Sequence, residues 1–316
     1  MKKYVESMKK TYTNELGRSA VQYLKAGLDL FHKQRQSYYA QPQIALGNLA
    51  IAVELMLKTL IAKNNLGLIL NKIPLELKVV FSCPESIPES FKWRRYDIDL
   101  RSFAYKTIEL NECISCFYIF FPELKQTLQP HLKFLSNFRN MSLHSALPSF
   151  QQYELDRVAF LSLQIFKILR DNKILEIFAY LPSEKDSKFL DDFKAERIER
   201  VKKIIEKAKE KSRKISHKGS AVILDPAGIW DAYVFTCPIC DSDGILNGYT
   251  EDDLVEDEDG FVPILGFFAD AFNCDECGLS LEDVEELELA GIDTHHDRSD
   301  DQDRWFAEMG HPFEDY

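Results

Sequence analysis

Two cysteine pairs near the C-terminal end constrain the fold of this chain more than any other feature. Cys237 and Cys240 form one C-x-x-C pair, Cys274 and Cys277 form the other, and 33 residues separate the pairs. Two such pairs can supply four thiolates in tetrahedral geometry, which is how proteins bind structural zinc. Because all four positions are cysteines, the site is closed, and we expect the zinc to contribute folding energy and not catalysis.

A redox role for either pair is the alternative, but two pairs flanking one short β-prone segment disfavour it. Gly278 directly follows the second pair and suits a tight knuckle. The segment resembles a zinc ribbon with an unusually long hairpin between its knuckles. His295, His296 and His311 are weaker metal candidates with Asp293 or Asp297, and we interpret these histidines as solvated side chains of a flexible acidic tail.

The compartment follows from cysteine usage and from the apolar runs. Seven cysteines, an odd number, favour metal ligation in a reducing compartment over a disulfide framework. The lysine-rich first 13 residues contain no apolar signal-like segment, and the longest mostly apolar run, over residues 114–121, is far too short to cross a bilayer. We expect a cytoplasmic protein without a membrane partner.

The charge is divided unevenly along the chain. Residues 219–316 carry two basic and 27 acidic side chains, a net charge of −25, whereas residues 1–218 carry 37 basic and 24 acidic side chains, a net charge of +13. This division indicates a polyanion-binding part followed by a part that repels nucleic acid.

Apolar residues recur at helical spacing through most of the first 181 residues. The pattern predicts five helices, at residues 14–36, 44–64, 109–120, 123–143 and 151–181, with Pro130 expected to kink or split the fourth. Short links between most of them favour an up-and-down bundle.

We therefore expect a mainly α chain followed by a small α+β domain of zinc-ribbon type. The predicted domains are a helical bundle over residues 1–183 with an insertion near 66–105, a charged connecting helix over 184–218, and an acidic zinc-binding domain with a C-terminal tail over 219–316.

Three candidate catalytic residues lie near the end of the fourth predicted helix. Asn140 and His144 are four residues apart and share a helix face, and Arg139 projects from the adjacent face. Arginine binds phosphate bidentately, and a histidine with a pKa near ~6.5 can exchange the proton that an RNA 2′-hydroxyl loses when it attacks its own phosphodiester. By spacing alone, interaction of His144 with the last carbonyls of its helix is the simpler explanation.

The order of the helices together with this motif resembles the HEPN family of helical-bundle domains. Residues 40–63 resemble the second helix of that family with its Glu-x-x-x-Lys pattern, and residues 106–122 resemble the following helix. The run Phe138-Arg139-Asn140-x-x-x-His144 matches the ribonuclease motif. The resemblance covers roughly residues 14–182.

The resemblance implies a metal-independent endoribonuclease that works as a homodimer with two motifs in one cleft, and that leaves a 2′,3′-cyclic phosphate on its RNA substrate. It assigns proton transfer to His144, stabilisation of the phosphorane to Arg139 and orientation of both to Asn140. Catalysis then needs no cofactor. Proteins of this kind often act as toxins or in defence against phage.

Two further hypotheses follow. A non-catalytic RNA-binding or protein-interaction adaptor is the alternative function, because phosphate contacts alone would explain the basic charge. The division of charge also suggests that the acidic zinc domain has a regulatory or sensing role. It would regulate the nuclease by covering the basic part of the chain, or sense a protein trigger or inhibitor by binding it.

Overall fold

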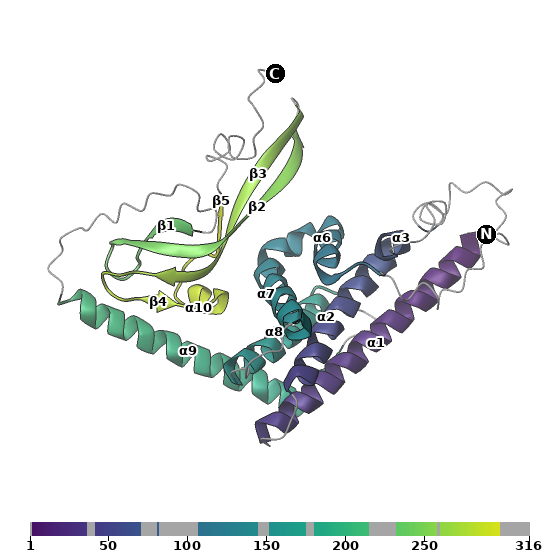
Figure 1. Cartoon of the computed structure of the whole chain (residues 1–316), viewed down its shortest axis with the longest axis horizontal. Helices are drawn as coiled ribbons and strands as arrows, with labels where there is room; N and C mark the ends of the chain where they lie inside the picture. Colours follow the sequence, from purple (N-terminus) through teal and green to yellow (C-terminus); the bar gives the residue numbers. More distant parts are fainter. Residues whose placement is uncertain are drawn as a thin grey trace. The chain divides into compact units, whose positions relative to one another are not determined.

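The computed structural model describes residues 2–36, 42–70, 81, 107–144, 152–174, 180–214, 232–257 and 260–297 (Figure 1). The chain divides into two compact units, Met1–Asp191 and Asp192–Tyr316. The first unit is helical, and the second combines the larger part of one helix with a small antiparallel sheet. The expected mainly α chain with a small sheet and a cysteine cluster in its C-terminal region is therefore confirmed.

The first unit is built around one central helix. Its main helices are α1 (Lys2–Gln36), α2 (Pro42–Asn64), α6 (Leu110–Phe120), α7 (Lys125–His144) and α8 (Gln152–Asp171), and it also contains the short α3 (Leu66–Ile69) and the 3-10 turn η3 (Pro122–Leu124). α2 lies beside α1 along its length and also contacts α6, α7 and α8 (Figure 1). A helix that is apolar on every side must be covered on every side, which explains why α2 is central.

α2 is also long and apolar enough to cross a membrane by length and composition, and it is the one such helix in the described part of the chain. The expectation that residues 114–121 form the longest apolar run is therefore wrong. In the structure 72% of the apolar window of α2 is buried inside the protein. This burial is typical of the core helix of a soluble protein, and the structure is compatible with one.

Two helix ends differ from the expected pattern. α8 ends at Asp171 and not near residue 181, because Lys173 adopts a left-handed conformation (φ 59°) that no helix continues through. α7 is not split, since it runs through Pro130 as one helix. Pro130 lies in the second turn, so it removes a single backbone hydrogen bond there, and buried Leu128 and Leu132 hold the helix on both sides of it.

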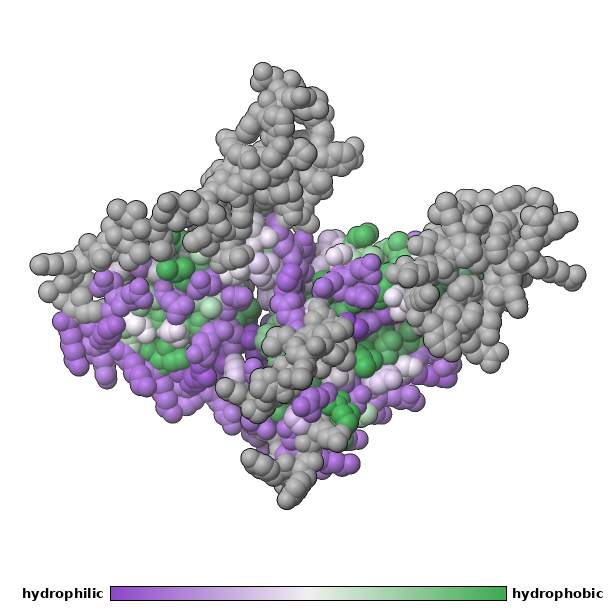
Figure 2. Space-filling model, viewed as in Figure 1, coloured by the Kyte–Doolittle hydropathy of each residue, from purple (hydrophilic) through white to green (hydrophobic). Residues whose placement is uncertain are grey.

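The helix α9 (Glu184–Ser212) begins in the first unit and ends in the second. Its outer surface is covered by hydrophilic side chains (Figure 2). The limits predicted for the three domains, at residues 183 and 218, remain predictions, whereas the two compact units separate within α9 at residue 191.

The second unit adds a five-stranded antiparallel sheet to the larger part of α9. The strands are β1 (Ala232–Thr236), β2 (Asp243–Asp257), β3 (Gly260–Asn273), β4 (Ser280–Leu281) and β5 (His295–Asp297), and the short helix α10 (Val284–Leu289) follows β4. The order is β1-β2-β3-β4, and β5 also pairs with β3. β2 and β3 form one long hairpin that connects the two cysteine pairs.

Candidate functional site

The two cysteine pairs form matching knuckles at the ends of β1 and β3. In the first, Asp241 N donates to Cys237 O (3.1 Å), and in the second, Gly278 N donates to Cys274 O (2.8 Å). Asp241 and Gly278 each follow the first cysteine of their pair by four residues, and both adopt a left-handed conformation, with φ of 57° and 71°. The same local turn therefore presents both cysteines of each pair.

The β2–β3 hairpin brings these knuckles together. Ile245 at the start of β2 pairs with Asn273 at the end of β3, so the two ends of the hairpin are adjacent. The 33 residues between the pairs lengthen the hairpin without separating the knuckles. The unusual spacing noted in the sequence is thus compatible with one metal site.

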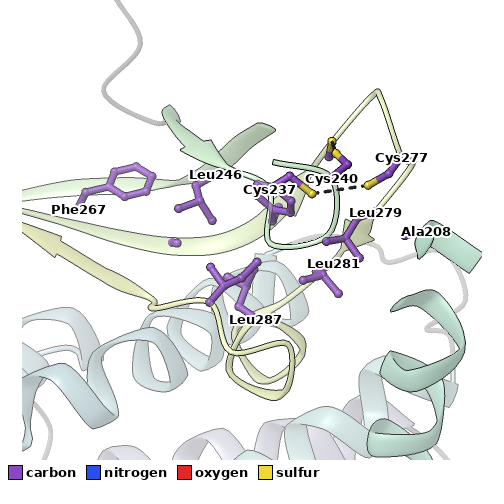
Figure 3. Close-up of a cluster of buried hydrophobic side chains, with 13 residues drawn as sticks. Ala208, Cys237, Cys240, Leu246, Phe267, Cys277, Leu279, Leu281 and Leu287 are labelled. Atoms are coloured by element: carbon purple, nitrogen blue, oxygen red, sulfur yellow. Dashed lines mark hydrogen bonds between the residues drawn. The ribbon is translucent and has the colours of Figure 1, made fainter. Parts of the chain in front are cut away.

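The four sulfur atoms converge on a single point (Figure 3). All of them lie within 4.8 Å of one another, and the cross-knuckle pairs Cys237–Cys277 and Cys240–Cys274 are each 3.6 Å apart. Four sulfurs around zinc at Zn–S distances of about 2.3 Å are separated by roughly 3.8 Å in a tetrahedron. These buried residues could therefore bind a metal ion such as zinc, as the sequence predicts.

Hydrogen bonds and burial act in opposite directions on the cysteines. Burial raises the pKa of Cys237 above its usual range and that of Cys277 to about 11. At Cys240 burial also acts to raise the pKa, but hydrogen bonds from the backbone and side chain of Ser242 and from neighbouring cysteine sulfurs outweigh it and lower the pKa to about 7. A bound cation would stabilise all four thiolates together.

α9 contributes to the core around the cysteines. Ala208 is buried in the same cluster as the four cysteines, Leu246 and Phe272, and Ile204 and Ile205 pack against it (Figure 3). Lys211 Nζ also donates to the carbonyl of Asp275 in the second knuckle (3.2 Å). The last turns of α9 therefore belong to the cysteine unit.

A buried ion network attaches α9 to α10. The Arg197 guanidinium, 6% exposed, pairs with the carboxylates of Asp283 and Glu286, the latter at 3.1 Å. Arg200 pairs with Glu286 through Nε (2.8 Å) and with Glu282. Asp283 also caps α10 by accepting from Glu286 N (3.0 Å). Each buried carboxylate here faces a guanidinium, so the charges of the network compensate one another without a metal.

Two histidines near the C-terminus, His295 and His296, are part of the sheet. His295 and His296 belong to β5 and pair with β3, so the expectation of a solvated tail is wrong at these residues. The ring of His295 lies 4.9 Å from that of Phe268, and the ring of His296 lies 5.6 Å from that of Phe235. In the described part of the chain the cysteines form the metal-binding group, and it includes neither histidine.

The candidate phosphate-binding residue Arg139 lies on α7 in the first unit. Its Nη2 atom is 3.0 Å from Oε2 of Glu54 on α2, and the Arg139 side chain is 19% exposed. The other oxygen of Glu54 accepts from Lys58 Nζ (2.6 Å), which also donates to Thr107 Oγ1 (2.7 Å). The three charged side chains hold one carboxylate between two cations, so together they carry a net charge of +1.

Thr107 is itself held in place by the backbone. It forms an antiparallel bridge with Leu70, and Ile108 N donates to Ile69 O (3.1 Å). Lys58, 4% exposed, therefore has two fixed acceptors, and Arg139 is the more exposed of the two cations. Arg139 is thus the most exposed side chain of the three.

The other two candidate catalytic residues are placed only by their backbone. Asn140 and His144 follow Arg139 on α7, and His144 ends that helix. Their side chains lie outside the described residues, so their predicted roles stay predictions. The structure thus brings together Arg139 with Glu54 and Lys58, a pair that the sequence showed only as part of a helix pattern.

The signal for Glu54 and Lys58 was present in the sequence. They are the two charged residues inside an otherwise apolar stretch of α2, four residues apart, where an ion pair between successive turns is expected. A buried charged pair in a largely buried helix requires partners, which marks it as a candidate site.

The chain combines a helical unit with a unit that contains a cluster of four buried cysteines. No family model, no curated protein and no solved structure matches this chain.

Proposed function

We propose that the first unit is a metal-independent endoribonuclease of HEPN type, a cytoplasmic toxin or anti-phage defence protein that acts on RNA as a homodimer. The observation that supports this best is the Glu54–Arg139 ion pair of 3.0 Å. It orients a guanidinium within a cluster of net positive charge, on the helix that carries the ribonuclease motif. Phosphate oxygens are natural partners for such a guanidinium.

In the proposed reaction the 2′-hydroxyl of a ribose attacks the adjacent phosphorus while His144 exchanges its proton. The 2′-oxygen–phosphorus bond forms, the phosphorus–5′-oxygen bond breaks, and the leaving 5′-oxygen receives a proton. The products are a 2′,3′-cyclic phosphate and a 5′-hydroxyl. Arg139 donates hydrogen bonds to the charged oxygens of the phosphorane, because a guanidinium is too basic to accept the proton itself. Asn140 orients the side chains of His144 and Arg139.

The test is cleavage of RNA by full-length protein in a Mg²⁺-free buffer. The zinc content of the protein is verified first, because a strong chelator would also remove a metal from the cysteine site. We expect cleavage by the wild type and a loss of at least 100-fold in His144→Ala and Arg139→Ala. Thr127→Ala, an exposed change near the start of the same helix, is the matched control and should cleave normally.

Cleavage that persists in His144→Ala, or that requires added Mg²⁺, contradicts the mechanism. A dimer is expected by light scattering. If zinc-replete dimeric protein binds RNA in a salt-sensitive manner but cuts no class of RNA, the adaptor function is the correct one.

The regulatory part of the proposal concerns the acidic second unit. Counted by compact units, residues 1–191 carry 26 basic and 19 acidic side chains, a net charge of +7, and residues 192–316 carry 13 basic and 32 acidic, a net charge of −19. We propose that this unit lowers nuclease activity until a partner engages it. The fragment of residues 1–191, shown to be folded by circular dichroism, should then cut RNA faster than the full chain. Equal or slower cleavage by that fragment contradicts autoinhibition.

A further inference from the structure

A pocket of about 420 Å³ lies in the first unit. Its lining residues include none of the Arg139 cluster. One side is formed by α1 and the other by the segment that leads into α9. Ten residues line it: Lys25, Leu28, Asp29, His32, Lys33, Tyr180, Leu181, Ser183, Lys185 and Asp186. The volume lies in the range of small-molecule sites, about 300–1,000 Å³.

The carboxylate of Asp186 is saturated by donors at the edge of this pocket. Its Oδ1 atom faces His32 Nε2 at 2.8 Å, and its Oδ2 atom accepts from the Tyr180 hydroxyl (2.5 Å) and from Ser183 Oγ and N (2.6 and 2.8 Å). Burial alone would raise the pKa of Asp186, but these hydrogen bonds hold it well below its usual range. Asp186 is therefore ionised, and both of its oxygens already accept hydrogen bonds from the protein.

His32 is oriented by this carboxylate. Because the ionised Asp186 only accepts, Nε2 of His32 carries the proton of their 2.8 Å hydrogen bond. The ring also packs near Phe31 (5.3 Å between centroids) and Phe189 (6.3 Å), which restricts its rotation. The side chain remains 18% exposed, and Nδ1 contacts no hydrogen-bonding partner among the described residues. A carboxylate thus fixes one nitrogen of a pocket-lining imidazole and leaves the other for a ligand.

Three lysines line the same pocket. Lys25, Lys33 and Lys185 form no ion pair with any residue that the structure describes, and the carboxylates in the lining are those of Asp29 and Asp186. Leu28 and the strongly exposed Leu181, 74% accessible, supply an apolar wall. The pocket therefore offers excess positive charge, one oriented imidazole and apolar surface.

We propose that this pocket binds a small phosphate-bearing ligand, of which a mononucleotide is the model. The lysine ammonium groups compensate the charge of the phosphoryl group. His32 contacts it through Nδ1, since in the imidazolium form the ring donates to Asp186 from one nitrogen and to the phosphoryl oxygen from the other. Leu28 and Leu181 cover the apolar part of the ligand. The lining contains no residue of the proposed nuclease motif, so this proposal does not depend on that motif.

The experiment is calorimetric titration of the full-length, zinc-replete protein with three probes: AMP, inorganic phosphate and adenosine. AMP should bind, phosphate should bind more weakly, and adenosine, which lacks the phosphoryl group, should bind at least tenfold more weakly than AMP. Lys185→Gln and Lys33→Gln should each raise the Kd for AMP by about tenfold. Lys10→Gln, an exposed lysine of α1 outside the pocket, should leave it unchanged.

His32→Gln separates ligand binding from folding. A glutamine Nε2 can still donate to Asp186, but the side chain lacks the atom equivalent to Nδ1. This variant should keep its unfolding transition and lose about tenfold in affinity for AMP. The nuclease variant His144→Ala should bind AMP as the wild type does, so failure of the nuclease proposal and failure of this one are distinguishable.

Three results would overturn the proposal. The first is no heat of binding for AMP and phosphate at millimolar concentration. The second is equal affinity for adenosine and AMP, which removes recognition of the phosphoryl group. The third is that only an RNA oligonucleotide shows binding sensitive to His32→Gln and Lys185→Gln, which would make the pocket an RNA contact.

Discussion

Nη2 of Arg139 on α7 lies 3.0 Å from Oε2 of Glu54 on α2, and the second oxygen of the same carboxylate accepts from Lys58. The pair is largely enclosed, since the side chains of Glu54 and Arg139 are 11% and 19% exposed. An ion pair of this kind contributes orientation as much as stability, because its Coulombic gain largely offsets the cost of desolvation. Glu54 therefore positions the guanidinium, and it does so from a residue 85 positions earlier in the chain.

Substitution of Glu54 by Gln tests that relationship. The variant leaves Lys58 and Arg139 enclosed without their shared anion, which should lower the free energy of unfolding of the first unit by about 2–4 kcal/mol. If the proposed nuclease is correct, the single-turnover rate of RNA cleavage should also fall about tenfold. Glu123→Gln, an exposed change, is the control. A folded Glu54→Gln protein with wild-type cleavage would show that Arg139 needs no such positioning.

Metal analysis tests the cysteine site. Full-length protein purified without added chelator should contain one zinc ion per chain, and Cys237→Ser or Cys274→Ser should lose it, because three thiolates hold zinc much more weakly than four. Cys116→Ser, on α6, should retain the metal. Inductively coupled plasma mass spectrometry and thermal melts give the two readouts. A wild-type chain that binds no zinc, cobalt or iron would refute the metal centre.

Removal of the Arg197 guanidinium should destabilise the second unit strongly. Arg197→Met leaves the buried carboxylates of Asp283 and Glu286 short of one cation, and breaking a buried pair in this way costs about 3–5 kcal/mol. The free energy of unfolding is measured by chemical denaturation, with the release of zinc as the readout. Arg213→Met, an exposed change at the end of α9, should cost under about 0.5 kcal/mol. Equal stability of the two variants would show that the network contributes nothing.

The pH dependence of stability should change in Asp186→Asn. The native pKa of Asp186 lies below the unfolded value of about 3.9, so its stabilisation is complete above that pH and is lost as the pH falls toward the native pKa. The free energy of unfolding of the wild type should exceed that of Asp186→Asn by about 1–3 kcal/mol at pH 7, and this difference should shrink between pH 4 and pH 2. Urea unfolding at pH 7, 5 and 3 measures it. A difference that is constant with pH would mean that the charge of Asp186 contributes nothing.

Fragments test where the second unit begins. Ile204, Ile205 and Ala208 of α9 pack against the cysteine core, so residues 192–316 should fold with bound zinc, whereas residues 219–316 should expose that core and fail to fold cooperatively. The amide dispersion in NMR spectra of the two zinc-loaded fragments distinguishes them. A well-dispersed spectrum from residues 219–316 would show that α9 is dispensable.

Local patterns predicted a large part of this structure. The spacing of apolar residues located α2, α6 and α7 to within a few residues, since α6 and α7 each bury one face and α2 is buried on most sides. The C-x-x-C spacing predicted both knuckles, since the turn that presents two cysteines needs only five consecutive residues. These features depend on neighbours in the chain, which a sequence displays directly.

The features that the sequence did not predict all join distant segments. α9 has the composition of a solvated connecting helix, and only the packing of its last turns shows that it belongs to the cysteine unit. His32 and Asp186 are 154 residues apart, and neither lies in a motif. The sequence by itself determined the helices, the knuckles and the uneven charge, because these arise from residues close in the chain. The tertiary structure decided which charged groups meet, because an enclosed ion is tolerated only where folding brings it a partner.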